Sequence, residues 1–156
     1  MNVQANDVQI RRMTPADVPR VMAIASSLPE APRWPVSAYL DALNPESPAR
    51  RIALVAAASE QVQGFVVASL LPPQAELETI AVASQNQRQG LGRLLFDALS
   101  LELHKEGVAE VALEVRASNR AAMAFYRSAG FGQKGIRRSY YVDPVEDAVV
   151  MGLRLI

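Results

Sequence analysis

Cysteine is absent from this chain of 156 residues, and histidine occurs once, at His104. The absence of cysteine excludes a disulfide framework, a thiolate zinc site and an acyl-enzyme on a cysteine. It also fits the reducing cytoplasm. His104 falls in the last turn of an expected helix, where a cation suits the helix dipole, so we interpret it as structural. We therefore expect no metal centre.

An excess of one charge is also absent. Lysine plus arginine and aspartate plus glutamate both total 16, so the formal net charge is zero. No global field would attract nucleic acid or an anionic membrane, and neither is expected as a partner. No apolar run approaches the roughly 20 residues that span a bilayer, and residues 1–8 lack a signal-peptide pattern. We expect a soluble, cytoplasmic protein.

Half of the residues are hydrophobic and 21% are charged, which suits one compact domain over residues 1–156. The sequence does not decide between a monomer and a weak homodimer.

The first half of the chain predicts helices between strands, with a hairpin after them. The expected elements are a strand at 8–12, a helix that begins at Thr14 and Pro15, a helix at 36–43, and a hairpin of strands 52–58 and 64–71 joined by the polar residues 59–63.

The second half alternates strands and helices before a final strand pair. The expected elements are a strand at 76–82, a helix from Gly90 to about 106, a strand at 108–115, a helix at 119–129 and strands at 131–138 and 148–155. Alternation in the middle with hairpins at both ends predicts an α/β fold with a mixed, mostly antiparallel sheet and helices on both faces.

The most informative stretch is Gln87-Arg88-Gln89-Gly90-Leu91-Gly92-Arg93, between an apolar strand and an apolar-periodic helix. The first N–H groups of a helix lack intrahelical acceptors and lie at the positive end of the dipole, so they bind phosphate or pyrophosphate. Glycines let a bound group approach the backbone closely, and Arg88 and Arg93 add positive charge. A tight turn alone is the structural alternative. Neither the Walker loop nor the complete dinucleotide fingerprint is present.

Three further segments accompany this loop: Leu113-Glu114-Val115-Arg116-Ala117-Ser118-Asn119, Ala124-Phe125-Tyr126-Arg127-Ser128-Ala129-Gly130-Phe131 and Arg137-Arg138-Ser139-Tyr140-Tyr141. With the loop, they resemble the Gcn5-related N-acetyltransferase (GNAT) superfamily, and within it the RimI branch of ribosomal-protein alanine N-acetyltransferases. The resemblance covers the chain from about Glu76 to the end. It implies the GNAT fold, with a central sheet of about seven strands.

The resemblance also implies acetyl-CoA as cosubstrate. The residues it assigns to the cofactor are Ile80, Ala81, Val82, Arg88, Gln89, Gly90, Leu91, Gly92, Arg93 and Asn119. The strand residues would act through their backbones, by adding pantetheine to an opened sheet position. Asn119 would contact pantetheine or phosphate through its amide, although Asn119 or Ser118 could simply be the N-cap of the next helix.

Glu114 is the candidate general base. Strand alternation turns it away from Leu113 and Val115, and a carboxylate is unusual on a mostly apolar strand. One explanation is that it forms an ion pair with a nearby arginine such as Arg116. The resemblance favours the other, in which Glu114 accepts a proton from the acceptor ammonium, directly or through water.

Tyr126 is the candidate general acid. An aromatic at helical spacing from Met123 and Ala129 is commonly part of a core. The resemblance instead puts its hydroxyl near the CoA sulfur, where it could protonate the departing thiolate. Because a free thiol has a pKa of about 8.5, this help is useful but dispensable.

Three aromatic residues are candidates for binding the acceptor. Trp34 precedes Pro35 and is either a packing anchor or a wall of the peptide slot, and Tyr140 and Tyr141 belong either to a solvated hairpin or to a flap that grips peptide backbone. Both regions depart somewhat from RimI sequences, most visibly in the shorter turn at 142–145.

The resemblance implies transfer of acetyl from acetyl-CoA to the N-terminal alanine of a ribosomal protein. Because the chain has no cysteine, we expect direct attack of the amine on acetyl-CoA within a ternary complex. One alternative keeps the chemistry but uses a lysine side chain, a polyamine or another small amine, and a lysine ammonium would need a stronger base or more desolvation. A non-catalytic acyl-CoA-binding regulator is a second alternative.

Overall fold

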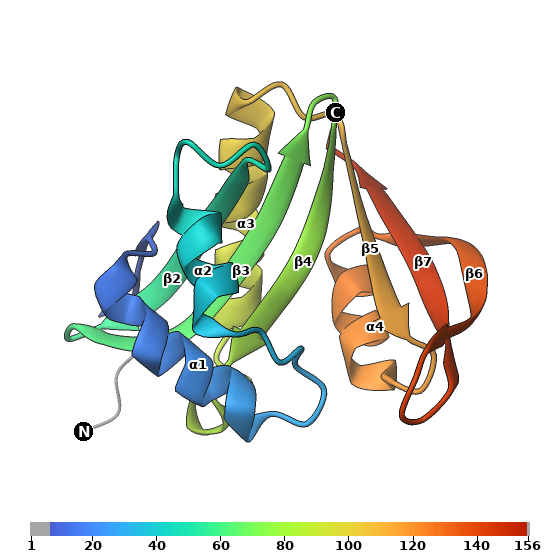
Figure 1. Cartoon of the computed structure of the whole chain (residues 1–156), viewed down its shortest axis with the longest axis horizontal. Coiled ribbons are helices and arrows are strands. Elements are labelled where there is room, and N and C mark those ends of the chain that lie inside the picture. Colours follow the sequence, from blue (N-terminus) through green and yellow to red (C-terminus); the bar gives the residue numbers. More distant parts are fainter. Residues whose placement is uncertain (1–6, 156) are drawn as a thin grey trace.

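The computed structural model describes residues 7–155, and it contains one seven-stranded mixed sheet with helices on both faces (Figure 1). Residues 1–6, which make up most of the segment tested for a signal peptide, lie outside the described range. The elements are β1 (Gln9–Arg12), a 3-10 helix (Pro15–Asp17), α1 (Val18–Ser27), α2 (Val36–Leu43), β2 (Arg51–Ala58), β3 (Gln61–Leu71), β4 (Gln74–Val82), a 3-10 helix (Ser84–Asn86), α3 (Leu91–Lys105), β5 (Glu110–Arg116), α4 (Arg120–Ser128), β6 (Gly132–Tyr141) and β7 (Glu146–Arg154).

The strand order is β1-β2-β3-β4-β5-β7-β6, and every neighbouring pair is antiparallel except β4 and β5. The predicted fold class is therefore confirmed. Within residues 7–155, no helix is long and apolar enough to cross a membrane.

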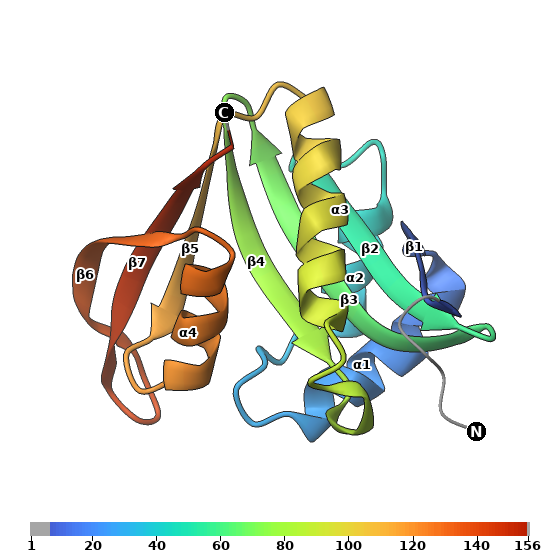
Figure 2. The same cartoon turned by 180° about the vertical axis from the view of Figure 1, so that it is seen from behind.

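Two layers of helix enclose two cores. Helices α1 and α2 cover one face of β2, β3 and β4, which we call the front face, and bury Tyr39 against Phe65 with ring centroids 6.2 Å apart. Helices α3 and α4 cover the back face (Figure 2). The back core extends further, because Leu95 of α3 and Leu113 of β5 belong to one buried cluster that also includes Met151.

The first predicted helix starts differently from expectation. Thr14 and Pro15 open a 3-10 turn, and the α-helix begins only at Val18. Asp17 holds this corner, since its carboxylate accepts hydrogen bonds from the Thr14 backbone N–H (2.8 Å) and from Arg11 (2.7 and 2.9 Å).

The predicted hairpin is present, but its loop is shorter than expected. Strand β3 begins at Gln61, and the connection is a tight turn in which Ser59 (φ 51°) and Glu60 (φ 65°) have positive φ. Such turns favour Asn-Gly or Asp-Gly, so the residues here carry no turn signature. A second tight turn at Pro72 and Pro73 joins β3 directly to β4.

The parallel pair β4–β5 is very short. Its register covers only Gln74 with Glu110, Ala75 with Val111, and Glu76 with Ala112. Beyond Glu76 the two strands diverge, and Figure 1 shows the opening between them. Within the described residues, the β5-facing edge of β4 from 78 to 82 therefore has no strand partner.

Candidate active site

Glu114 lies on the front face of β5, as strand alternation predicts. Its neighbours Leu113 and Val115 are buried in the back core, whereas the Glu114 side chain is 21% exposed. The front of β5 and β7 is not covered by any helix of residues 7–155, and it forms a cleft of about 850 Å³. Glu114, Glu110 and Glu76 all line this cleft. A carboxylate is thus exposed where an external amine could reach it.

The partner of Glu114 is an arginine, but not the one expected. Arg137 of β6 donates to Glu114 Oε1 over 2.6 Å. Arg116 turns away instead, pairs with Glu146 (3.4 Å) and lies 4.3 Å above the Tyr141 ring. The register explains the difference, because Ala148 on β7 is the small residue between Arg116 and Arg137, so the long Arg137 side chain can cross it diagonally.

A second carboxylate faces Glu114 across the cleft. Burial, together with the negative charges of Glu114 and Glu78, raises the pKa of Glu76, and Arg137 opposes this effect. The cleft floor is therefore a region where negative charges repel one another.

Tyr140 and Tyr141 lie beside Glu114 because β6 is irregular there. Between Arg137 and Tyr141 the register with β7 slips, Ser139 has φ 50°, and its N–H donates to Asp147 Oδ1 over 2.8 Å. The Tyr140 hydroxyl interacts with the Glu114 carboxylate, which raises the pKa of Tyr140. The two tyrosine rings lie 5.1 Å apart.

The glycine loop ends as predicted at the N-terminus of α3. Gly90 is the N-cap with φ 81°, a conformation that side chains rarely adopt, and Arg88 also has a positive φ of 64°. The N–H of Leu94 is the first to bond back, to Gly90 O (3.1 Å), so the preceding N–H groups of the helix are available to an external acceptor. Such a loop is suited to an anion.

Other loop residues differ from the simple expectation. Position 92 favours glycine because α4 packs closely against it: a Cβ there would come within 3.3 Å of the Phe125 ring. The Leu91 side chain is buried. The Arg93 guanidinium binds Asp97 (2.9 Å) and Ser128 O (3.0 Å), which joins α3 to α4. Arg88 and Gln89 remain exposed.

Asn119 is the N-cap of α4, which settles the choice between it and Ser118. Its Oδ1 accepts from the Ala122 N–H over 3.1 Å, and this leaves the amide NH₂ as the part able to contact a ligand.

Tyr126 is half-buried between Phe125 and Phe131, with ring centroids 5.5 and 5.7 Å away. Burial, with a smaller effect of Tyr141, raises the pKa of Tyr126 to about 12. It therefore keeps its proton at every physiological pH. The pKa of Tyr141 is raised by burial and by Glu114.

On β4, Ile80 and Val82 pack partly against the back core, and Ala81 is buried in the front core. Their side chains are thus occupied with packing. The groups of these residues that face the diverging β5 are backbone groups.

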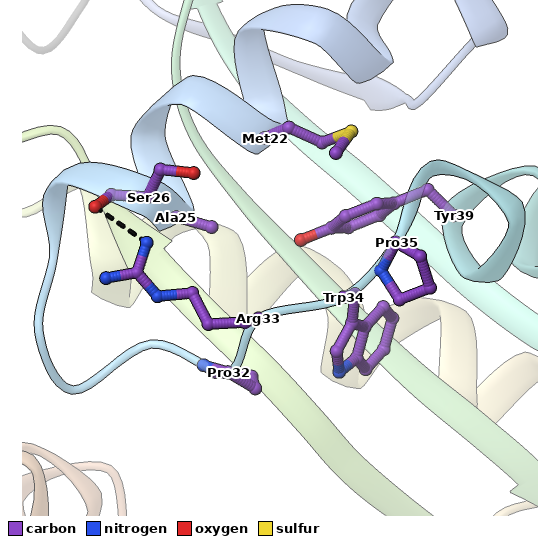
Figure 3. Close-up of a pocket in the computed structure, with 8 residues that line it drawn as sticks. All are labelled: Met22, Ala25, Ser26, Pro32, Arg33, Trp34, Pro35 and Tyr39. Atoms are coloured by element: carbon purple, nitrogen blue, oxygen red, sulfur yellow. Dashed lines mark hydrogen bonds between the residues drawn. The ribbon is translucent and has the colours of Figure 1, made fainter.

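Trp34 lies in the loop between α1 and α2 (Figure 3). Its ring packs 5.2 Å from Tyr39, and with Met22, Pro32 and Arg33 it lines a separate pocket of about 270 Å³. The packing interpretation of Trp34 is therefore confirmed, and its contact with an acceptor stays a prediction.

Sequence reasoning missed the pairing of Arg137 with Glu114, the approach of Glu76, and the support from Asp147. None of these has a local signal, because each depends on which strands become neighbours. His104 lies in the last turn of α3 as predicted. Residues 7–155 contain no cluster of three or more histidine, aspartate or glutamate side chains suited to a metal ion.

The chain belongs to the acetyltransferase (GNAT) family, whose model matches residues 20–131. It is 48% identical over 95 residues to the [ribosomal protein bS18]-alanine N-acetyltransferase of Escherichia coli K12, a match that covers 60% of this chain and 64% of that relative. It is 33% identical over 143 residues to a putative enzyme of the same name from Bacillus subtilis, with 91% and 92% covered.

The fold comparison agrees. The crystal structure of the ribosomal-protein-S18-alanine N-acetyltransferase from Escherichia coli superposes with a TM-score of 0.83 at 35% identity, and covers 95% of this chain and 94% of that one. The RimI-like resemblance is thereby confirmed.

Proposed function

We propose that this protein is an acetyl-CoA-dependent N-α-acetyltransferase that acts on the N-terminal alanine of a ribosomal protein in the cytoplasm. The observation that carries the proposal is the divergence of β4 and β5, with the glycine loop at its back and Glu114 at its front. This geometry separates a place for an anionic cofactor from a place for an amine.

The residues fit acetyl-CoA, which supplies an activated acetyl group when bound. The N–H groups at the start of α3 would hold the pyrophosphate, with charge from Arg88 and the dipole of a 15-residue helix. The backbone of Ile80, Ala81 and Val82 would pair with pantetheine amides as a missing strand would. The Asn119 amide would add a contact from α4.

On the front side, Glu114 would accept the proton that the acceptor must lose. A peptide α-ammonium has a pKa of about 7.7 to 8.0, so a carboxylate suffices as base at neutral pH. Tyr140 and Tyr141 would bind the acceptor backbone, and Trp34 would line the opposite wall. Direct attack on acetyl-CoA follows, since the chain has no cysteine to carry the acetyl group.

Tyr126 would donate a hydrogen bond to the departing thiolate. Proton transfer from a phenol with a pKa of about 12 to a thiolate whose conjugate acid has a pKa of about 8.5 is uphill. We therefore assign Tyr126 mainly the stabilisation of negative charge on sulfur, and a supporting part as general acid.

The name of the Escherichia coli relative, [ribosomal protein bS18]-alanine N-acetyltransferase, supports the acceptor class. The decisive experiment incubates the protein with acetyl-CoA and two matched peptides, one with a free N-terminal alanine and one with that terminus blocked. Both peptides carry one internal lysine. Mass spectrometry should find acetyl only on the free α-amine, and acetyl on the lysine of the blocked peptide would refute the proposal.

The three carboxylates of the cleft, which also contains Lys134 and Arg154, favour one second candidate. Because Glu76, Glu110 and Glu114 line the same cleft, a polyamine would find several carboxylates there. Turnover of spermidine in preference to the alanine peptide would select that function.

A further inference from the structure

The guanidinium of Arg137 is held from two sides. Its Nη1 lies 2.6 Å from Glu114 Oε1, and its Cζ lies 4.6 Å from the centre of the Tyr140 ring. A cation over an aromatic face is attracted by the ring quadrupole, so Tyr140 fixes the arginine that in turn contacts Glu114. Tyr140 also interacts with the Glu114 carboxylate directly. The three side chains form one cluster, which we call the Glu114 cluster.

The β6 backbone is built to hold this cluster. The slip in register lets the chain extend by three residues against one on β7, and Asp147 satisfies the Ser139 N–H that the slip frees. In a regular strand, Tyr140 and Tyr141 would point to opposite faces of the sheet. The irregularity of β6 changes where Tyr140 lies, and Tyr140 contacts the arginine that pairs with Glu114 on β5, two strands away.

The surrounding charges give Arg137 a distinct role. Glu76 faces Glu114 from β4, and Glu78 adds a further negative charge. Of the other cations nearby, Arg116 pairs with Glu146 and Arg51 with Glu78, whereas Lys134 and Arg154 line the cleft and form no ion pair with Glu114. Within residues 7–155, Arg137 is the one cation in ion-pair contact with Glu114.

We propose that Arg137 is a positioning residue for acetyl transfer: it holds the Glu114 carboxylate in a fixed orientation toward the cleft, against the repulsion of Glu76. The inference rests on the proposed function. A carboxylate has two oxygens and about four acceptor sites, so Glu114 can keep its contact with Arg137 while it accepts a proton from the acceptor. Arg137 itself transfers no proton.

The test compares Arg137→Gln and Arg137→Lys with Arg50→Gln. Arg50, which directly precedes β2, is a matched control, because it is equally exposed (57% against 56%) and forms a similar ion pair with Glu106 (2.8 Å). Turnover of a free N-terminal alanine peptide is measured at saturating acetyl-CoA, and the affinity for acetyl-CoA is measured by calorimetry.

Arg137→Gln should lower kcat by about 10- to 100-fold, a part of the 10² to 10⁴ that a general base contributes. The affinity for acetyl-CoA should not change, and Arg50→Gln should retain the wild-type kcat. Arg137→Lys should recover most of the rate, because the ion pair uses one nitrogen only and a lysine cation can also lie over Tyr140.

A double-mutant cycle makes the test specific to Glu114. In a Glu114→Gln background, Arg137→Gln should have almost no further effect, since the base it positions is already lost. Equal losses in both backgrounds would overturn the inference, as would an unchanged kcat in Arg137→Gln. If the wild-type protein acetylates no alanine peptide, the proposed function fails instead, whatever Arg137 does.

Discussion

The front face of the sheet has two halves with opposite characters. Over β2 to β4, helices α1 and α2 cover it and bury Tyr39, Phe65 and Val67. Over β5 and β7 it is bare, and Glu114 and Val150 line an open cleft. The strand sequences differ accordingly, since β2 and β3 are buried almost throughout, while β5 alternates between buried and exposed positions.

The same contrast appears in two ion pairs of nearly equal length. Arg11 and Asp17 lie 2.7 Å apart in the covered half, where the carboxylate is buried and also accepts a hydrogen bond from Thr14. Arg137 and Glu114 lie 2.6 Å apart in the open half, where the arginine is mostly exposed. The first pair stabilises a chain reversal. The second leaves a carboxylate accessible to an external amine, so similar chemistry serves structure in one half and reaction in the other.

The largest expected effect is in the open half. Glu114→Gln should lower kcat by roughly 10² to 10⁴, with little change in the affinity for acetyl-CoA or in Tm. Steady-state kinetics and calorimetry measure both quantities, and Glu106→Gln, which removes a carboxylate from a surface ion pair, is the control. A fall in affinity with unchanged turnover of the bound complex would remove Glu114 from its role as base.

In the covered half, we expect substitutions to reduce the stability of the fold. Phe65 is fully buried, and Phe65→Ala should lower the free energy of unfolding by about 3 to 5 kcal/mol, as truncation of a core aromatic does. Val150→Ala on the bare half should cost only roughly 1 kcal/mol. Urea unfolding measures both variants. Equal costs would mean that the bare half is covered in solution.

Asp17→Asn should have an intermediate effect. Hydrogen bonding to Arg11 lowers the pKa of Asp17 to about 2, and the lowered value means that ionised Asp17 stabilises the fold above the unfolded pKa of about 3.9. This contribution, about 2 kcal/mol, should be lost progressively as the pH falls from about 5 to about 1, through the folded pKa of Asp17. The difference in unfolding free energy between wild type and variant should therefore be smaller at pH 2.5 than at pH 7, and a constant difference would contradict the assignment.

Tyr126→Phe should have the smallest effect, about a tenfold decrease in kcat, because a phenol with a pKa of about 12 is a poor proton donor to a thiolate. The decrease should shrink with a thioester whose leaving thiol is more acidic. A decrease of a thousandfold would instead make Tyr126 an obligatory acid.

Much of this protein follows from local patterns. Alternation in β5 turned Glu114 away from the core, and the glycines after β4 marked the N-terminus of α3. The predicted end of that helix near residue 106 also agrees with the structure, where Gly107 follows with φ 83°. These features depend on residues within a few positions of one another, where periodicity and backbone preference act directly.

Tertiary structure alone decided which side chains and strands contact each other. The sequence placed Arg116 nearest to Glu114, but the register of β7 between β5 and β6 brought Arg137 to it. The two-residue turn at Ser59 and Glu60 carries no turn signature, and packing of β2 on β3 imposes its positive φ values. The early end of the β4–β5 ladder likewise depends on the paths of two strands that α3 separates in the chain. Such contacts join residues far apart in the chain, so no local pattern encodes them.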